Sequence, residues 1–363
     1  MKIESELQEK ALHASFTEVQ QRHFDKLMSE LEVISGGLGF AELKAKAEAG
    51  SKEALQVMRD YITKKEQIVN FIETKEFFPL MKPNELLEKL RSGPSEEVKE
   101  NTGRLFKTTA YGDTGLWDDF VESESGVSRV TSATQFLSAI NMNLIKPQER
   151  FTDSFLHLID IRCKSDGLYK HRFDGPENFY CNSQLYGVLA FVFDGQMARA
   201  KDFYSEIQQS ELYDVEAEVW MNRVGEFGED SSQMTENYLL QVIVEYFLGN
   251  QEKAEQVYRD LKKVSYQEAE GMWNDQLSDE ADSYVSRVQL LGSLAHGLVE
   301  DPDEGEIDWC RMKNTDLWDK KKKMWRYMEK DEGVDKDIDI HTRDQFLENI
   351  LVAVFKKLNY IET

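Results

Sequence analysis

Hydrophobic and polar positions between residues 232 and 261 repeat with the 3.6-residue spacing of an α-helix, but Gly249-Asn250 interrupts the pattern. A mostly apolar run precedes the glycine, and a more charged amphipathic run follows it. A glycine in the left-handed conformation is a common end for a helix. The stretch therefore predicts two helices joined by a tight turn.

The same pattern occurs 54 residues earlier, because residues 181–207 align without gaps on residues 235–261 and Gly195 falls on Gly249. A second recurring feature, Leu or Met followed by Trp or Tyr, ends at five places: Trp117, Tyr169, Tyr213, Trp273 and Trp318. The intervals between them are 52, 44, 60 and 45 residues, which suits a unit of two helices and their connections. We expect about five or six helical hairpins.

The first helix of each hairpin is apolar and rich in small residues, whereas the second is more charged. This contrast predicts inner and outer helices, and a closed ring buries inner helices on nearly all sides. The expected fold class is all-α, an α/α toroid formed by residues 110–330. Residues 1–109 are expected to be an N-terminal helical segment packed on the ring or completing it. Residues 331–363 are expected to be a connector and a last helix, with Thr342 and Gln345 as a capping box.

The hairpins "VLAFVFDGQMARAKDFY" and "VIVEYFLGNQEKAEQVY", with the turns "GLW" and "GMW", resemble those of the α/α-toroid enzymes, above all the six-hairpin glycosidases of the glucoamylase-like kind. The segment "KSDGLY" is similar to the turns of terpenoid cyclase and prenyltransferase toroids. The glucoamylase-like resemblance implies a general acid directly after the Gly-apolar-Trp turn. Only Asp118 matches that pattern, because Lys170 and Asn274 occupy the other two positions.

Composition narrows the classes of partner. The chain has 363 residues, of which 40% are hydrophobic, so it can bury a sizeable core. A formal charge of −24 repels nucleic-acid phosphates and anionic membrane surfaces, and neither is an expected partner. The start "MKIESELQEKALHASF" does not read as a signal peptide, and three cysteines do not form a secreted disulfide framework. We expect a cytoplasmic protein.

Glycoside hydrolysis needs two carboxyl groups facing one sugar linkage. Candidate catalytic acids at the predicted starts of inner helices or in the turns are Glu236, Asp279, Glu280 and Asp118. Asp174 and Glu177 are candidates for substrate binding. Carboxylates in the first turn of a helix also favour the helix dipole, so a purely structural role stays open for these acids.

Arg287 lies within an otherwise apolar helical run, so it must either pair with an acid or reach a ligand. Trp117, Tyr169 and Trp273 could present flat faces to a sugar ring, or could pack each turn against its neighbour. The spacing of Cys163, His171 and Cys181 matches no closed zinc site. No metal or cofactor is expected.

The leading hypothesis is a carbohydrate-active protein that hydrolyses or binds a small-molecule or oligosaccharide ligand in a central pocket. If it is an enzyme, the resemblance implies one like the glycoside hydrolases. One alternative is a non-catalytic helical scaffold with a toroid fold. A second alternative is an enzyme like the terpenoid cyclases or prenyltransferases, which would need an apolar cavity.

Overall fold

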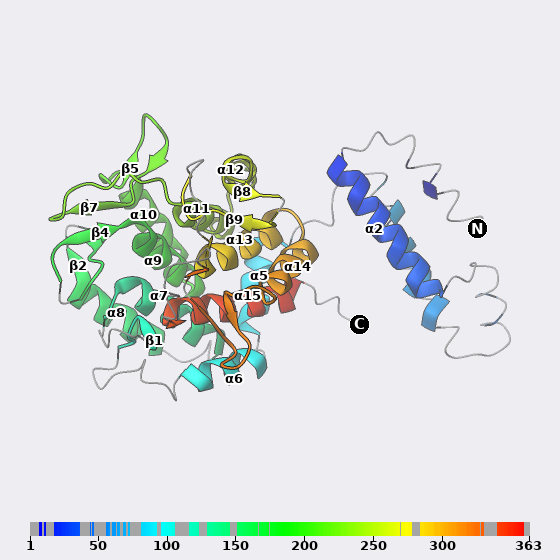
Figure 1. Ribbon diagram of the computed structural model, residues 1–363, viewed down its shortest axis with the longest axis horizontal. Helices are drawn as coiled ribbons and strands as arrows, with labels where there is room; N and C mark the ends of the chain where they lie inside the picture. Colours follow the sequence, from blue (N-terminus) through cyan, green and yellow to red (C-terminus); the bar gives the residue numbers. More distant parts are fainter. Residues whose placement is uncertain are drawn as a thin grey trace. The chain divides into compact units, whose positions relative to one another are not determined.

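A computed structural model of the chain has two compact units, Met1–Leu80 and Met81–Thr363 (Figure 1). In the first unit the structure describes residues 18–36 and shorter stretches between residues 7 and 72. In the second unit it describes residues 81–92, 96–105, 116–122, 129–145, 151–165, 167–173, 175–268, 270–277, 284–326, 328–329 and 340–358. The first unit has its own small core, in which α2 (Glu18–Ser35) contributes Phe24, Leu27 and Leu31.

The division after Leu80 lies nearer the N-terminus than the expected boundary after residue 109. Two helices account for the difference, α5 (Pro83–Arg91) and α6 (Glu96–Leu105). They bury Leu86, Leu90 and Val98 in the large core of the second unit, so they belong to it. The last helix, α15 (Thr342–Leu358), is also part of that core.

Five inner helices form a closed ring: α7 (Ser132–Ile145), α9 (Cys181–Phe193), α11 (Thr235–Leu248), α13 (Ser286–Val299) and α15. Each packs against the next one in the chain, and α15 packs against α7, which closes the circle. Four outer helices each pair with the inner helix before them: α8 (Phe151–Cys163), α10 (Met197–Gln208), α12 (Gln251–Ser265) and α14 (Pro302–Met312). The fold is therefore an α/α toroid, as predicted.

The predicted hairpin turns are confirmed. Helix α11 ends before Gly249, which has a φ of 92° and donates its N–H to carbonyls of the last helical turn, and α12 begins at Gln251. Gly195 makes the corresponding turn after α9 with a φ of 84°. Only glycine adopts this backbone readily, because a Cβ atom would clash with the backbone there.

Short two-stranded sheets join outer helices to the next inner helix, so they lie at the end of the ring where the inner helices begin. Four are hairpins: β2–β3 (Lys164–Ser165, Leu168–Tyr169), β5–β6 (Tyr213–Asp214, Val219–Trp220), β8–β9 (Tyr266–Gln267, Met272–Trp273) and β11–β12 (Trp318–Asp319, Met324–Trp325). Three more pairs are antiparallel: β1–β14 (Phe120–Glu122, Ile340–His341), β4–β7 (Asn178–Tyr180, Arg223–Gly225) and β10–β13 (Tyr284–Val285, Met328–Glu329).

A glutamine at the fourth position of four inner helices binds the backbone of the preceding aromatic turn. In each case the amide oxygen accepts the N–H of the aromatic residue and the amide nitrogen donates to its C=O, at 2.6 to 3.1 Å. The pairs are Gln135 with Trp117, Gln184 with Tyr169, Gln289 with Trp273 and Gln345 with Trp325. In α11, Tyr238 takes this position and hydrogen-bonds to the backbone of Trp220. We call this contact the glutamine clamp.

At two of the five recurring positions, the aromatic residue bound by the clamp differs from the one identified in the sequence. Tyr213 and Trp318 lie on the first strand of their hairpins, where they pair with Trp220 and Trp325 on the second strand. The structurally equivalent aromatics are Trp117, Tyr169, Trp220, Trp273 and Trp325, at intervals of 52, 51, 53 and 52 residues. The repeat is therefore more regular than the sequence pattern suggested.

Two predicted helix starts also change. The inner helix expected to start near the candidate acids Asp279 and Glu280 begins at Ser286, because Tyr284–Val285 pairs as a strand with Met328–Glu329. Gln345 does not form a capping box with Thr342, because its amide is engaged with Trp325 and with the carbonyl of His341.

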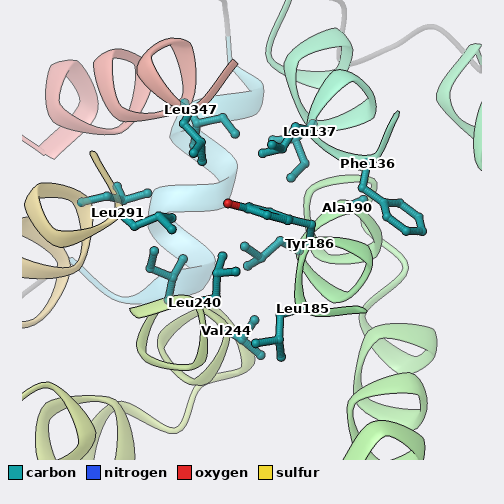
Figure 2. Close-up of a cluster of buried hydrophobic side chains, with 14 of the residues drawn as sticks. Phe136, Leu137, Leu185, Tyr186, Ala190, Leu240, Val244, Leu291 and Leu347 are labelled. Carbon is teal, nitrogen blue, oxygen red and sulfur yellow. The ribbon is translucent and has the colours of Figure 1, made fainter. Parts of the chain in front are cut away.

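The sixth residues of the inner helices fill the middle of the ring. Figure 2 shows them converging from the surrounding helices, with the Tyr186 hydroxyl directed to the centre. This apolar layer consists of Leu137, Tyr186, Leu240, Leu291 and Leu347, all at most 3% exposed. Residues four apart share one face of a helix, so the second residue of each inner helix lies above this layer and also faces the axis.

Helix α5 covers the other end of the ring. It contacts α7, α11 and α15, and Arg91 donates hydrogen bonds to the carbonyls of Val192 and Phe193 at the end of α9. The Tyr246 hydroxyl, near the end of α11, hydrogen-bonds to the carbonyl of Met81 just before α5. No helix in the described part of the chain is long and apolar enough to cross a membrane.

Replacing Gln289 with alanine should destabilise the ring, because the buried N–H and C=O of Trp273 lose their partners. We expect the free energy of unfolding to fall by about 2–4 kcal/mol, measured by urea unfolding followed by tryptophan fluorescence. Gln256, on the exposed side of α12, is the matched control, and its replacement with alanine should change stability by less than about 0.5 kcal/mol. Equal effects of the two substitutions would contradict a clamp.

Candidate functional site

Polar residues gather where the five inner helices begin, above the apolar layer. Because all five run in the same direction around the ring, their first turns meet at one end. The second residues, in ring order, are Ala133, Asn182, Glu236, Arg287 and Arg343, and the third residues include Thr134, Ser183, Asn237 and Asp344. All of these are at least nine-tenths buried. We call this group, with the residues that contact it, the polar end.

Glu236 and Arg287 form a buried ion pair between neighbouring helices α11 and α13. Arg287 Nε lies 2.7 Å from Glu236 Oε2, and the Tyr186 hydroxyl donates to Glu236 Oε1 at 3.1 Å. Burial opposes ionisation of Glu236, but Arg287, Arg343 and a hydrogen bond from Asn182 outweigh it and lower the pKa of the carboxyl. Glu236 is therefore an anion at neutral pH.

Asp344 is fully buried in the first turn of α15, and neither of its carboxyl oxygens has a hydrogen-bond partner in the part of the chain that the structure describes. Burial raises the pKa of Asp344 to about 7, against the attraction of Arg287 and Arg343. The negative charges of Glu236 and Asp119 add to the increase. At neutral pH Asp344 can hold a proton and can also release it, which is the property of a general acid or base.

Two histidines at the polar end are neutral at pH 7. Burial and the charge of Arg343 lower the pKa of His171 to about 4, and its ring lies 4.3 Å from that of Tyr180. Burial, Arg343 and Arg287 lower the pKa of His341 to about 2. His341 is on β14, and its ring contacts Phe120 on β1 at 4.6 Å.

Several other buried polar atoms at this end have no hydrogen-bond partner among the described residues. They include both amide atoms of Asn237, Oδ1 of Asp275 and Nε of Arg343. Each such atom costs about 1–3 kcal/mol when it is removed from water without a partner. A folded chain seldom carries this cost at one place without a function for it, so the cluster indicates a site that binds a polar ligand.

The predicted site residues divide into those the structure brings together and those it does not. Glu236 and Arg287 lie together at the polar end. Asp118 instead accepts the backbone N–H groups of Phe120 and Arg129 in its own turn. Glu177 is exposed and accepts a hydrogen bond from Ser165 at 3.0 Å. The remaining candidates, Asp174, Asp279 and Glu280, lie outside the described residues.

The three candidate aromatic platforms have buried rings. Trp117 packs edge-on against Phe346, with 5.0 Å between ring centroids. Tyr169 packs against Phe136 at 4.9 Å, and Trp273 packs against Tyr266 at 5.0 Å. Their exposed fractions are 2%, 0% and 3% in that order. In this structure their faces cover other protein side chains, not the polar end.

Sequence reasoning missed Asp344, Arg343 and His341, and it considered His171 only as a possible zinc ligand. The segment "HTRDQ" matched the start of an ordinary helix, in which an acid in the first turn needs no further explanation. An alignment of the inner helices on the fourth-position Gln or Tyr would have found Arg343 and Asp344, because it places them level with Glu236 and Asn237. Within the described residues, no group of three or more His, Cys, Asp or Glu side chains could hold a metal ion.

No protein-family model matches the chain, and no curated protein matches it in sequence. The chain is similar to several solved structures of carbohydrate-active enzymes. One is a D-mannose isomerase, with 11% sequence identity, a TM-score of 0.49, and coverage of 77% of this chain and 94% of that chain. Another is an α-amylase from Clostridium perfringens, with 11% sequence identity, a TM-score of 0.49, and coverage of 72% of this chain and 97% of that chain. A cellobiose 2-epimerase from Bacillus thermoamylovorans is a further example, with 9% sequence identity, a TM-score of 0.44, and coverage of 74% of this chain and 98% of that chain. The assignment of the ring rests on the helix contacts of this chain itself.

The raised pKa of Asp344 predicts that asparagine at this position stabilises the fold at high pH. As pH rises above about 4, the Asp344 carboxyl ionises in the unfolded chain but keeps its proton in the folded chain until about pH 7. The free energy of unfolding of the wild type therefore falls over this pH range. Asp344→Asn cannot ionise. We expect its advantage over wild type in thermal unfolding to grow between pH 5.5 and pH 8, by on the order of 1–2 kcal/mol.

The exposed Asp260 is the matched control, and Asp260→Asn should show no such gain. A stability difference between Asp344→Asn and wild type that stays constant over this pH range would contradict the assignment.

Proposed function

We propose that the chain is a carbohydrate-active enzyme that hydrolyses a glycosidic bond at the polar end, with Asp344 as the general acid and Glu236 as its anionic partner. Glycoside hydrolysis needs one protonated and one ionised carboxyl group. The observation that carries the proposal is the opposite shift of two buried carboxyls, with the pKa of Asp344 raised to about 7 and that of Glu236 lowered. Environments that push two pKa values apart are typical of acid–base pairs.

Because one end of the ring is closed, the structure favours a short substrate. The apolar layer lies directly below the polar end, and α5 covers the opposite end of the ring. A long glycan could not pass along the axis through these side chains. The arrangement therefore favours a small glycoside, or the end of a longer chain, entering from one side.

The two alternative hypotheses fit the polar end less well. A terpenoid-processing enzyme needs an apolar cavity for a hydrocarbon chain, whereas the axis-facing residues here include Glu236, Arg287 and Arg343. A scaffold with no ligand would gain stability by replacing the unpartnered Asn237 and Asp344 with apolar residues. The retained polar groups favour binding and chemistry over a purely structural role.

A second candidate function is isomerisation or epimerisation of a reducing sugar, which the two neutral histidines favour. A neutral imidazole can accept the proton next to a carbonyl group, and a nearby arginine can stabilise the resulting oxyanion. His171 and His341 both lie within the electrostatic influence of Arg343. In this reaction no glycosidic bond breaks.

Activity measurements on Asp344→Asn and Glu236→Gln test the hydrolytic proposal. With nitrophenyl glycosides and short oligosaccharides as substrates, we expect each substitution to lower kcat/KM by about 100-fold or more. Asp260→Asn, on the exposed side of α12, is the control and should retain wild-type activity. Circular dichroism establishes that each variant is folded.

The same samples separate the two reactions. Proton NMR in deuterated water should show release of a free sugar without exchange at the carbon beside its carbonyl group. Exchange at that carbon with no bond cleavage would replace hydrolysis with isomerisation. Full hydrolytic activity in folded Asp344→Asn would refute the assigned acid.

A further inference from the structure

Arg343 is a buried arginine with no hydrogen-bonded or ion-paired acid among the described residues. It is 8% exposed, its Nε has no partner, and it occupies the second position of α15. Leu347, four residues later on the same helix face, is part of the apolar layer at the centre of the ring (Figure 2). The Arg343 side chain therefore starts from the face of α15 that is directed to the axis.

The position of α15 in the ring explains why Arg343 has no acidic partner. Arg287, at the second position of α13, pairs with Glu236 on the neighbouring helix α11. The helix that follows α15 around the ring is α7, and its second residue is Ala133. The nearby acid Asp119 is already bonded to the hydroxyls of Thr131 and Thr134.

The charge of Arg343 acts across the ring. It influences the ionisation of Glu236 on α11 and Tyr186 on α9, although the inner helices that α15 packs against are α13 and α7. It also influences His171, in the loop between β3 and β4. These influences agree with the position of Arg343 on the face of α15 that carries Leu347 and is directed to the ring interior.

We propose that Arg343 binds an anionic group of the substrate, so that the substrate is a sugar acid or a sugar phosphate and not a neutral sugar. A planar guanidinium matches a carboxylate or phosphate with two parallel hydrogen bonds, and such an anion removes the cost of burying the arginine alone. The unpartnered Asp344 carboxyl and Asn237 amide supply hydrogen bonds for sugar hydroxyls. This inference rests on the proposed carbohydrate function and specifies its substrate class.

Isothermal titration calorimetry on the full chain tests the subsite with three probes: D-glucuronate, D-glucose 6-phosphate and D-glucose. We expect at least one of the two anions to bind about 10- to 100-fold more tightly than glucose, because hydrogen bonds to a charged group are the stronger kind. Comparison of glucuronate with glucose 6-phosphate decides between carboxylate and phosphate.

Arg343→Gln should abolish the preference for the anion, so that neither anion binds more tightly than glucose. Arg343→Lys keeps the charge and should retain part of the preference. Arg259→Gln, on the exposed surface of α12, is the matched control and should bind like wild type. A second control is the unfolding temperature, which shows whether Arg343→Gln remains folded.

The outcomes separate this inference from the proposed function. Equal affinity for glucose and both anions, or an anion preference that survives in Arg343→Gln, would overturn the subsite even if neutral glycosides are hydrolysed. Anion binding that depends on Arg343, with neither glycoside hydrolysis nor sugar isomerisation, would support the subsite and overturn the proposed catalysis.

Discussion

The orientation of four of the five inner helices depends on one contact, the glutamine clamp, and in α11 Tyr238 binds the backbone of the preceding turn in its place. A side-chain amide that binds both the N–H and the C=O of a turn residue fixes the rotation of its helix about the axis as well as its height. With the fourth residue held against the preceding turn, the second and sixth residues face the centre of the ring. The polar end and the apolar layer beneath it are both consequences of this orientation.

The clamp also explains how one end of a largely apolar ring can hold so many charges. Glu236 and Arg287 meet because their helices are neighbours and are held at the same height. A buried ion pair of this kind gains little net stability, because the desolvation of both charges offsets their attraction. The two charges of the pair act on Asp344 in opposite directions, since Arg287 lowers the pKa of its carboxyl and Glu236 raises it.

The sequence predicted the hairpins well because their signals are local. Gly195 and Gly249 mark tight turns by their own conformational freedom, and the apolar spacing on either side fixes the helices. The recurring aromatics were predicted less accurately. Tyr213 and Trp318 precede the clamped residues by one strand, and only cross-strand pairing distinguishes the two strands of a hairpin. The start of α13 was misplaced for a similar reason, because β10 pairs with a strand more than forty residues away.

By itself the sequence determined the toroid class, the tight turns, the presence of Glu236 at the start of a helix and that of Arg287 within one, because these follow from the spacing of residues along one segment. Only the tertiary structure decided that Glu236 pairs with Arg287, that Asp344 is buried without a partner and that Arg343 faces the axis. These properties depend on which helices are neighbours when the ring closes from α15 to α7. The burial that raises the pKa of Asp344 exists only in the closed ring, and no local pattern of residues encodes it.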